Sequence, residues 1–357
     1  MTRIGVVGCG YWGSKHVRVF HELPDAQLAI VCDRDHGCLE KVRYSYPGVR
    51  TTREFSEVLE SDVDGIVIAT PVNTHYPLAR QALLAGKHVL VEKPMTTSVE
   101  TAQELVQIAE EKRLVLMTGH TYQYHPAIEY LRDFLASGEL GDLYYVDSAR
   151  LNLGIFQPDV DVLWDLAPHD VSILLFLLGQ NPIWVSAEAT AHINPSLYEV
   201  SYLGLGFPGQ VLAHIHVSWL DPCKVRRLTL VGSKRMVVFD DVSPVEQVRI
   251  YDKGVSLHYN GDGRAAPAVA YRNGEVRVPA IPSKEPLKME CADFIECIET
   301  GRRPRSSGVE GLKVISILQA AHRSLARGGG REDMDMIKLF GGDQDTSGVP
   351  SIASNRR

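Results

Sequence analysis

Three glycines near the N-terminus constrain the fold of this chain more than any other feature of the sequence. Gly8, Gly10 and Gly13 follow a short run of apolar, β-branched residues, and a helical pattern begins among them. In this spacing the first glycine permits a tight turn, the second lets the backbone approach a ligand, and the third lets a helix pack closely on a strand. The segment therefore predicts a strand, a turn and a helix whose first N–H groups are open to a pyrophosphate.

An acid at the end of the next predicted strand supports a dinucleotide site. The apolar run 27–32 leads directly into Asp33, whose carboxylate would accept hydrogen bonds from ribose hydroxyls and repel a 2′-phosphate. This pattern favours NAD over NADP as the cofactor. Arg34 keeps NADP open, because a neighbouring guanidinium can accommodate a phosphate. The alternative interpretation is an ordinary glycine turn in an α/β domain.

Strand and helix patterns alternate through the first third of the chain. Buried strands are predicted at 64–71, 88–94 and 114–120, with amphipathic helices at 75–86 and 98–113. This rhythm predicts a doubly wound parallel sheet covered on both faces, and ligands of such sheets bind beyond the carboxyl ends of the strands. The predicted cofactor-binding residues are Gly8, Gly10, Tyr11, Trp12, Gly13, Asp33, Arg34, Thr70, Pro71, Asn73, His75, Glu92 and Lys93.

The pattern changes in the second part of the chain. Strand-like stretches occupy 143–153, 200–207, 210–220, 226–232 and 235–241, and two late helical patterns occupy 285–304 and 310–325. Runs of strands after an alternating α/β domain predict an α+β partner domain. We therefore expect a Rossmann domain at 1–122, a second domain at 123–327 and a flexible tail, rich in Gly, Asp and Ser, at 328–357.

Composition limits the class of partner. The 357 residues are 45% hydrophobic and 23% charged, as in a soluble protein with room for two domains. The formal net charge of −7 argues against a nucleic-acid partner, which needs a basic face, so small molecules are expected. The chain enters a strand at once and has no membrane-spanning apolar run, so we expect a cytoplasmic protein without a membrane partner.

The six cysteines are scattered along the chain, with no CxxC pair and no Cys/His cluster at zinc spacing. Neither a disulfide framework nor a metal site is predicted from such spacing. Reduced, buried thiols are the expectation.

The segment LWDLAPHD, 163–170, places an acid and an imidazole at the front of a strongly apolar run. Asp165 is well placed to be a helix N-cap, and Pro168 is tolerated in a first helical turn. His169 would then be a satisfied, partly buried histidine. The functional alternative is a carboxylate that orients a histidine acting as a base.

Four motifs in order resemble those of one known family. Gly8-x-Gly10-x-x-Gly13, then TPVNTH at 70–75, VEKP at 91–94 and the Asp-x-x-x-His of 165–169 are similar to the Gfo/Idh/MocA (glucose-fructose oxidoreductase / inositol dehydrogenase) family. The resemblance extends over about residues 1 to 325. It implies an NAD(P)-dependent sugar or polyol dehydrogenase whose second domain has a large, mostly antiparallel open sheet. It also implies a homodimer or homotetramer assembled through that sheet.

The resemblance implies a catalytic set of Lys93, Asp165 and His169. Oxidation of a secondary alcohol needs a base near the hydroxyl, and histidine titrates near neutral pH. Asp165 would orient the ring of His169, and the ammonium of Lys93 would stabilise developing alkoxide character. Read alone, Lys93 is equally a solvated loop lysine paired with Glu92. The family also implies a cis peptide bond before Pro94.

Further residues past strand ends are candidates for substrate contacts. The predicted substrate-binding residues are Tyr122, Tyr124, Arg150, Asn152, Asp165 and His169. Arg150 offers a planar fork to a phosphate or carboxylate, and His125 and the basic run 224–227 are further candidates. Each has the alternative of being a sheet or rim residue. The tyrosines of TYQY depart from the arginine or asparagine that is common in the family.

A narrower resemblance concerns the substrate. The segments 150–170 and 218–232 are similar to a subgroup associated with nucleotide-sugar metabolism. It implies NAD-dependent oxidation of a ring hydroxyl, at carbon-3, of a UDP-N-acetylglucosamine type of sugar. The alternatives are an NADPH-dependent 3-ketosugar reductase, an inositol or free-sugar dehydrogenase, and a non-catalytic NAD-binding sensor.

Overall fold

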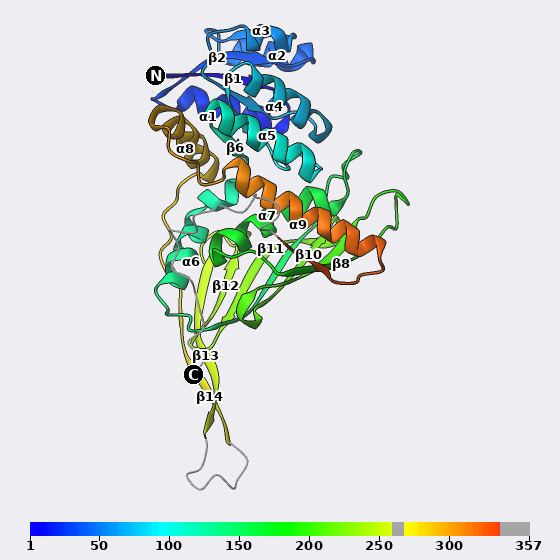
Figure 1. Ribbon diagram of the computed structural model, residues 1–357. Coiled ribbons are helices and arrows are strands. Elements are labelled where there is room, and N and C mark those ends of the chain that lie inside the picture. The colour runs from blue at the N-terminus through cyan, green and yellow to red at the C-terminus, as the bar shows by residue number, and fades with distance from the viewer. Residues whose placement is uncertain (259–267, 336–357) are drawn as a thin grey trace. The chain divides into compact units, whose positions relative to one another are not determined.

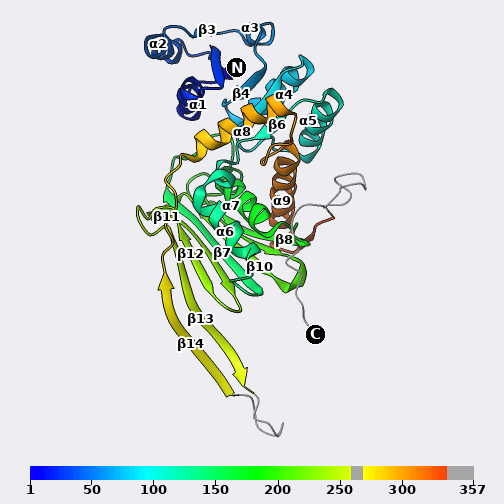
Figure 2. The same ribbon diagram turned by 90° about the vertical axis from the view of Figure 1, so that its left-hand side faces the viewer.

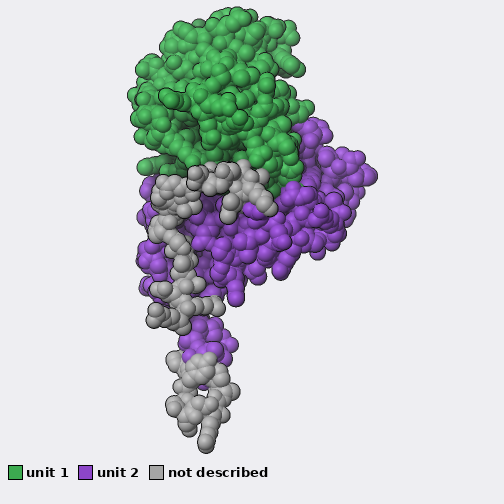
Figure 3. Space-filling model, in the orientation of Figure 1, with its two compact units in different colours: residues 1–125, 284–319 green, residues 126–283, 320–357 purple. Residues whose placement is uncertain are grey.

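The computed structural model describes residues 1–258 and 268–335, which form two compact units (Figure 3). The first unit contains Met1–His125 and Lys284–Gln319. The second unit contains the described residues of Pro126–Ser283 and those from Ala320 onward. The chain thus leaves the first unit and later returns to it. The sequence prediction had placed 284–319 in the second domain, and the structure corrects it.

A six-stranded parallel sheet forms the centre of the first unit (Figure 1), with strand order β3-β2-β1-β4-β5-β6. Its strands are β1 (Thr2–Val7), β2 (Ala26–Cys32), β3 (Arg50–Thr52), β4 (Gly65–Ile68), β5 (His88–Val91) and β6 (Leu116–Thr118). The central strands are buried on both faces, which is why they read as continuous apolar runs. The predicted doubly wound Rossmann sheet is confirmed.

Helices cover this sheet on both sides (Figure 2). They are α1 (Tyr11–Glu22), α2 (His36–Ser45), α3 (Phe55–Leu59), α4 (His75–Leu84), α5 (Val99–Lys112) and, late in the chain, α8 (Pro286–Thr300). Helix α9 (Gly308–Ala326) begins in the first unit and continues past Gln319 into the second. Short 3₁₀ turns lie at Val72–Thr74 (η1) and Thr121–Tyr124 (η2). Asp35 and Ser98 cap α2 and α5, because each side chain accepts a hydrogen bond from a first-turn N–H.

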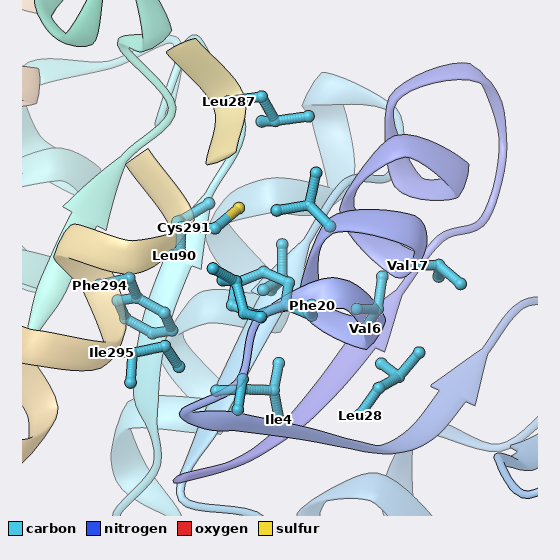
Figure 4. Close-up of a cluster of buried hydrophobic side chains, with 14 of the residues drawn as sticks. Ile4, Val6, Val17, Phe20, Leu28, Leu90, Leu287, Cys291, Phe294 and Ile295 are labelled. Carbon is cyan, nitrogen blue, oxygen red and sulfur yellow. The ribbon is translucent and has the colours of Figure 1, made fainter. Parts of the chain in front are cut away.

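Helix α8 completes the core of the first unit (Figure 4). Leu287, Cys291, Phe294 and Ile295 of α8 belong to one buried cluster with apolar side chains of β1 and α1 such as Ile4 and Phe20. The amphipathic pattern of 285–304 predicted the helix correctly. It did not predict the sheet that the helix covers, because a hydrophobic stripe identifies the buried face but not the partner.

A nine-stranded open sheet forms the second unit, with strand order β14-β13-β12-β11-β7-β10-β9-β8-β15. The strands are β7 (Leu143–Leu153), β8 (Trp184–Thr190), β9 (Val200–Gly206), β10 (Leu212–Ser218), β11 (Leu220–Gly232), β12 (Met236–Asp240), β13 (Val248–His258), β14 (Ala268–Arg277) and β15 (Glu332–Asp333). Among the described strand pairs of this sheet, β10 and β7 run parallel and all the others run antiparallel. The predicted mostly antiparallel sheet is confirmed.

Two helices, one short turn and the C-terminal end of α9 complete the second unit. Helices α6 (Pro126–Ala136) and α7 (Val162–Leu178) contact each other, and α7 contacts β7, β9 and β10 (Figure 2). A 3₁₀ turn, η3, lies at Pro208–Gln210. Strands β13 and β14 continue away from β12 as a two-stranded hairpin (Figures 1 and 2).

The predicted flexible tail, 328–357, begins with ordered chain. Strand β15 pairs with β8, and the buried carboxylate of Glu332 accepts hydrogen bonds from Arg323 Nε at 3.2 Å and Arg327 Nη1 at 2.7 Å. Backbone pairing and these charge-assisted bonds hold the segment, which the polar composition did not suggest. Residues 336–357 lie outside the described residues.

Within the described residues, no helix combines the length and the apolar character that crossing a bilayer requires.

We predict that Phe294→Ala destabilises the first unit by about 3–5 kcal/mol, because the phenyl ring of α8 is fully buried and a cavity would remain. Urea unfolding followed by tryptophan fluorescence measures the change, since Trp12 lies in this unit. Lys288→Ala on the same helix, whose side chain is half-exposed, should stay within about 0.5 kcal/mol of the parent. Equal effects of the two substitutions would contradict the assignment of α8 to this core.

Candidate active site

One edge of the Rossmann sheet collects the predicted cofactor residues. Backbone hydrogen bonds join Gly8 N to Cys32 O, Ala69 N to Val7 O, Glu92 N to Ile68 O and Gly119 N to Val91 O, all within 2.8–2.9 Å. The carboxyl ends of β2, β1, β4, β5 and β6 are therefore neighbours in space. In a doubly wound sheet this edge is the ligand-binding edge.

The glycine loop has the shape that a dinucleotide cradle requires. Gly8 has φ of +86°, and a Cβ there would lie 2.5 Å from the carbonyl oxygen of Ala69. A Cβ on Gly13 would lie 1.9 Å from the carbonyl oxygen of Gly8, so only glycine permits α1 to start this close to β1. A Cβ on Gly10 would meet no atom within 4 Å, which leaves open space over the start of α1. The residues present fit a pyrophosphate group.

Asp33 is held at the end of β2 by two backbone amides. Its Oδ2 accepts from Cys9 N at 2.6 Å, and its Oδ1 accepts from Asp35 N at 2.8 Å. Each carboxylate oxygen keeps a further lone pair for a ribose hydroxyl. Arg34 is exposed, and its carbonyl oxygen accepts from Arg53 Nε at 3.2 Å.

Two exposed aromatic residues begin α1. Tyr11 and Trp12 are 73% and 38% exposed, and Lys15 Nζ lies 4.2 Å and 4.6 Å from the centroids of their rings. These rings stand at the start of the helix that the glycine loop presents. Their predicted contact with the cofactor stays a prediction.

His75 links two of the loops at the sheet edge. Its Nδ1 lies 2.8 Å from Pro94 O, and its Nε2 lies 2.8 Å from Thr70 O. Burial lowers the pKa of this histidine, although both carbonyls oppose that shift, because only the protonated ring can donate to both of them. We therefore interpret His75, which was predicted to bind cofactor, as the residue that fixes the positions of Thr70 and Pro94. Pro71 and Asn73, which follow Thr70 in the first of these loops, are exposed.

Glu92 and Lys93 follow β5, and the Lys93–Pro94 peptide bond is cis, as the family resemblance implied. Glu92 is buried, and its carboxylate contacts His16 Nε2 at 2.8 Å and accepts from Lys93 N at 3.2 Å. Burial acts to raise the pKa of Glu92, but the hydrogen bond and charge of His16 and the nearby charge of Lys93 outweigh it, so the pKa is lowered. The backbone before the predicted catalytic lysine is thereby anchored.

The first unit also buries two polar side chains, those of His120 and Glu290, that were not among the predicted site residues. Burial lowers the pKa of His120 to about 4, and neither ring nitrogen has a hydrogen-bond partner among the described residues. Burial also raises the pKa of Glu290 on α8 well above its usual range, and its carboxyl accepts from Thr121 Oγ1 at 2.9 Å. No sequence pattern signals that Glu290 meets Thr121, since the two are far apart along the chain.

The tyrosines after β6 differ from each other in their surroundings. Tyr124 is only 1% exposed; its hydroxyl donates to Asp293 Oδ2 at 2.6 Å, and the Arg305 guanidinium lies 4.7 Å from the ring centroid. This core position does not fit the predicted substrate contact of Tyr124. Tyr122 is half-buried and stacks on His125 with ring centroids 6.2 Å apart. Its substrate role stays a prediction.

The second unit places Asp165 and His169 one turn apart on α7, on the same face of the helix. Asp165 Oδ2 accepts from Trp219 Nε1 at 3.1 Å, a bond from the segment between β10 and β11 that fixes the carboxylate. The N-cap is Asp161, which accepts from the N–H groups of the first turn. The N-cap alternative for Asp165 was therefore wrong, and Pro168 lies inside the helix rather than in its first turn.

Arg150 on β7 lies in a buried ion pair. Its Nε donates to Asp170 Oδ2 at 2.6 Å and its Nη2 to Asp170 Oδ1 at 3.2 Å, while Ser148 Oγ donates to the same Oδ1 at 2.8 Å. The fork that was predicted to bind substrate thus engages the residue next to His169, which favours a structural role. Asn152 on the same strand is exposed.

The basic run 224–227 lies on β11, where Arg226 Nη1 pairs with Asp241 Oδ2 at 3.2 Å. This pairing favours the alternative of a solvated sheet residue for Arg226. Lys224 and Arg227 are exposed.

Three side chains beside the glycine loop form a group that the sequence did not predict. Cys9, Asp33 and Cys38 bring two sulfurs and a carboxylate oxygen within 4.8 Å of one another. Burial, and then the charge of Asp33, raise the pKa of the Cys9 thiol far above its ordinary value. The spacing of these residues along the chain matches no zinc motif, and only the fold brings them together. Both cysteines are free; Cys9 is buried, as expected of the thiols, and Cys38 is partly exposed.

The predicted residues therefore fall into two groups. The first unit holds the glycine loop, Asp33, the Thr70–Asn73 loop and Lys93, and the second holds the pair Asp165 and His169. Trp219, His16 and Asp170, which position members of these groups, were missed because their contacts join distant parts of the sequence.

Comparison with known proteins agrees with this geometry. Residues 2–120 match the model of the oxidoreductase family with an NAD-binding Rossmann fold, and residues 128–238 match the GFO/IDH/MocA C-terminal domain. The chain belongs to the Gfo/Idh/MocA family of oxidoreductases, whose relatives are sugar and polyol dehydrogenases.

Two relatives span nearly the whole chain. UDP-N-acetylglucosamine 3-dehydrogenase of Acidithiobacillus ferrooxidans is 28% identical over 322 residues, covering 88% of this chain and 94% of the relative. A solved structure of UDP-N-acetylglucosamine 3-dehydrogenase GnnA from that organism is 27% identical, with a TM-score of 0.74 over 91% of this chain and 98% of that one. Inositol 2-dehydrogenase of Rhizobium meliloti is 24% identical over 342 residues, which is 91% of this chain and 97% of the relative.

We predict that His120 makes the first unit lose stability as the pH falls from about 6.5 to about 4, a contribution that buried Glu290 opposes because the folded chain keeps the Glu290 proton. The folded-state pKa of His120 is about 4, against 6.5 when exposed, so in this window the unfolded chain binds a proton that the folded chain rejects. Each such group costs at most about 1.4 kcal/mol per pH unit. Urea unfolding at several pH values measures the slope.

The matched variants are His120→Gln and His21→Gln, because His21 is an exposed histidine of the same unit. The first substitution should reduce the slope by about one proton in this window, and the second should not. An unchanged slope in His120→Gln would show that this ring titrates alike in both states.

Proposed function

We propose that this protein catalyses NAD-dependent oxidation of a ring secondary alcohol, at carbon-3, of a nucleotide-linked sugar of the UDP-N-acetylglucosamine type. The observation that carries the proposal is the pair Asp165 and His169 on one face of α7, with Asp165 fixed by Trp219. A chain that only bound the cofactor would have no need of this arrangement. The NAD-binding oxidoreductase family is the coarser statement on which the proposal builds.

The cofactor would be held by the first unit. The amide-lined glycine loop would bind the pyrophosphate, and Asp33 would accept from the ribose hydroxyls. When bound, NAD supplies the acceptor for the hydride that leaves the alcohol carbon. The fixed carboxylate of Asp33 favours NAD, because a 2′-phosphate would meet a negative charge held in place by two backbone amides.

His169 is the proposed proton acceptor. As the hydride leaves carbon, the hydroxyl proton must leave oxygen, and a neutral imidazole takes it without extreme adjustment of its pKa. Asp165, one turn earlier, lies on the same helical face and would support the imidazolium that forms. The ion pair of Asp170 with Arg150 anchors α7 to β7 at the position next to His169.

Lys93 is the proposed electrostatic group. Its ammonium would stabilise negative charge on the alcohol oxygen as the proton moves. The backbone on either side is anchored, through the Glu92 contact with His16 and the Pro94 carbonyl bond to His75. Such anchoring matters because a catalytic group held in a fixed place contributes more than a mobile one.

The substrate class rests on similarity along almost the full length of the chain. The relative named UDP-N-acetylglucosamine 3-dehydrogenase aligns through both units. Similarity to an inositol 2-dehydrogenase keeps inositols as the second candidate. A 3-ketosugar reductase would catalyse the reverse reaction, and a measured preference for NADPH would favour this alternative.

We also propose a homo-oligomer that assembles through the sheet of the second unit. Tyr145, Tyr202 and Leu212 are each between 42% and 52% exposed on the described chain. Register places Tyr145 opposite Leu212 and Tyr202 opposite His216, so these side chains share one face of the sheet. Exposed apolar residues gathered on one sheet face are typical of protein interfaces.

We predict that His169→Ala lowers kcat for a UDP-sugar by about 10²–10⁴-fold, because the proton acceptor is lost. NADH affinity should not change. Nicotinamide absorbance measures turnover of NAD or NADP with UDP-N-acetylglucosamine, UDP-glucose, N-acetylglucosamine and myo-inositol, and NADH fluorescence measures cofactor binding. His192→Ala removes an exposed histidine of the same unit and should leave both quantities unchanged.

Lys93→Ala alone and together with His169→Ala tests whether the two residues serve one reaction. If they do, the double variant loses less than the product of the two single losses. If the fold-loss in kcat of the double variant equals the product of the two single losses, the two residues do not share a role. Turnover of myo-inositol but of no UDP-sugar would replace the proposed substrate with the second candidate.

We predict that the parent enzyme prefers NAD, and that Asp33→Ser reduces this preference by at least about 10-fold in kcat/KM, equal to about 1.4 kcal/mol. The removed carboxylate no longer repels a 2′-phosphate. Glu40→Gln, an exposed charge change on α2, is the control. A parent preference for NADPH that Arg34→Ala abolishes would favour the reductase.

A further inference from the structure

The thiol and carboxylate group beside the glycine loop has the composition of a metal site. Cys9 lies between Gly8 and Gly10, Asp33 follows β2, and Cys38 is in the first turn of α2. Their ligand atoms lie within 4.8 Å of one another although they come from three separate segments. It is the one such group of three among the described ranges 1–258 and 268–335.

We propose that Cys9, Asp33 and Cys38 bind one thiophilic divalent cation, with Zn²⁺ as the expected ion. Two thiolates with one carboxylate form a mixed soft and hard ligand set that suits zinc and cadmium and discriminates against magnesium and calcium. Three protein ligands leave the fourth tetrahedral position to water.

Hydrogen bonds already fix the backbone of all three ligands, and Asp33 N donates to Thr52 O at 3.2 Å. Asp33 Oδ2 accepts from Cys9 N at 2.6 Å, and Cys38 N donates to the N-cap side chain of Asp35 at 3.1 Å. In tetrahedral coordination two sulfurs at about 2.3 Å from zinc stand roughly 3.8 Å apart. Two sulfurs already within 4.8 Å of each other therefore need to approach by about 1 Å or less, within the reach of side-chain rotation.

The position of the site predicts its effect on the enzyme. Under the proposed function Asp33 also accepts from the cofactor ribose, so the ion and NAD would use the same carboxylate. Cys9 stands in the loop proposed to hold the pyrophosphate. Metal binding and NAD binding should therefore exclude each other, which makes the cluster an inhibitory site rather than a catalytic one.

Cobalt titration of the full-length, fully reduced, cofactor-free protein tests the site directly. Co²⁺ bound to thiolates gives charge-transfer absorption and intense ligand-field bands in tetrahedral geometry. We expect one equivalent to bind with this signature and to be displaced by Zn²⁺. Cys38→Ser should weaken zinc binding by at least about 10-fold. Removing a residue that only hydrogen-bonds a metal ligand already costs about 10-fold or more in affinity, and here a ligand itself is lost.

Cys223→Ser is the matched control, because Cys223 is an exposed cysteine of the other unit. It should retain the parent signature and affinity. Circular dichroism checks that Cys38→Ser and a second variant, Cys9→Ser, remain folded. Absence of the thiolate signature in the parent, or equal zinc affinity in all variants, would overturn the proposed site.

NADH titration with and without Zn²⁺ tests the exclusion. At a zinc concentration that just saturates the parent, we expect zinc to weaken NADH binding to the parent and to have a much smaller effect on Cys38→Ser. Zinc that binds with the thiolate signature but does not change NADH affinity would refute the shared carboxylate. Failure of NADH to bind without metal, with cobalt binding intact, would refute the proposed function and leave the metal site standing.

Discussion

The close approach of α1 to β1 is the constraint on which the first unit depends. A Cβ on residue 13 would lie 1.9 Å from the carbonyl oxygen of Gly8, so any residue other than glycine would push the helix off the strand. The same turn presents Cys9 N to Asp33, which ties the end of β2 to the loop. One steric requirement thus sets the helix start, the open space above Gly10 and the direction of the acidic side chain.

Both units use a buried carboxylate to place the neighbouring residue. In the first unit Glu92 contacts His16 in the interior, and Lys93 follows it in sequence. In the second, Asp170 pairs with Arg150 in the interior, and His169 precedes it. Buried pairs of this kind add little net stability, because desolvation offsets their attraction, but breaking one is costly. Their value here is positional, since a proposed reacting side chain stands directly beside each anchor.

The sequence predicted what local pattern controls. The glycine turn, Asp33 at the strand end, the parallel strands and the late helices appear where the pattern indicated. It failed where partners come from far along the chain. The fork of Arg150 was predicted to bind substrate, but Asp170 occupies it. Tyr124 was predicted to contact substrate, but it is buried and its hydroxyl donates to Asp293 of α8. The N-cap of α7 was misplaced because Asp161 and Asp165 both suit that role, and only backbone conformation distinguishes them.

The return of the chain through α8 also determines when the first unit can form during synthesis. Its sheet is complete by residue 118, but Leu287, Cys291 and Phe294 are made only after nearly the whole second unit. Until then the apolar face of α1 and β1 lacks its cover. The N-terminal unit of this chain can therefore finish folding only after most of the second unit has been made, which departs from the N-terminal-first order usual for proteins of successive domains.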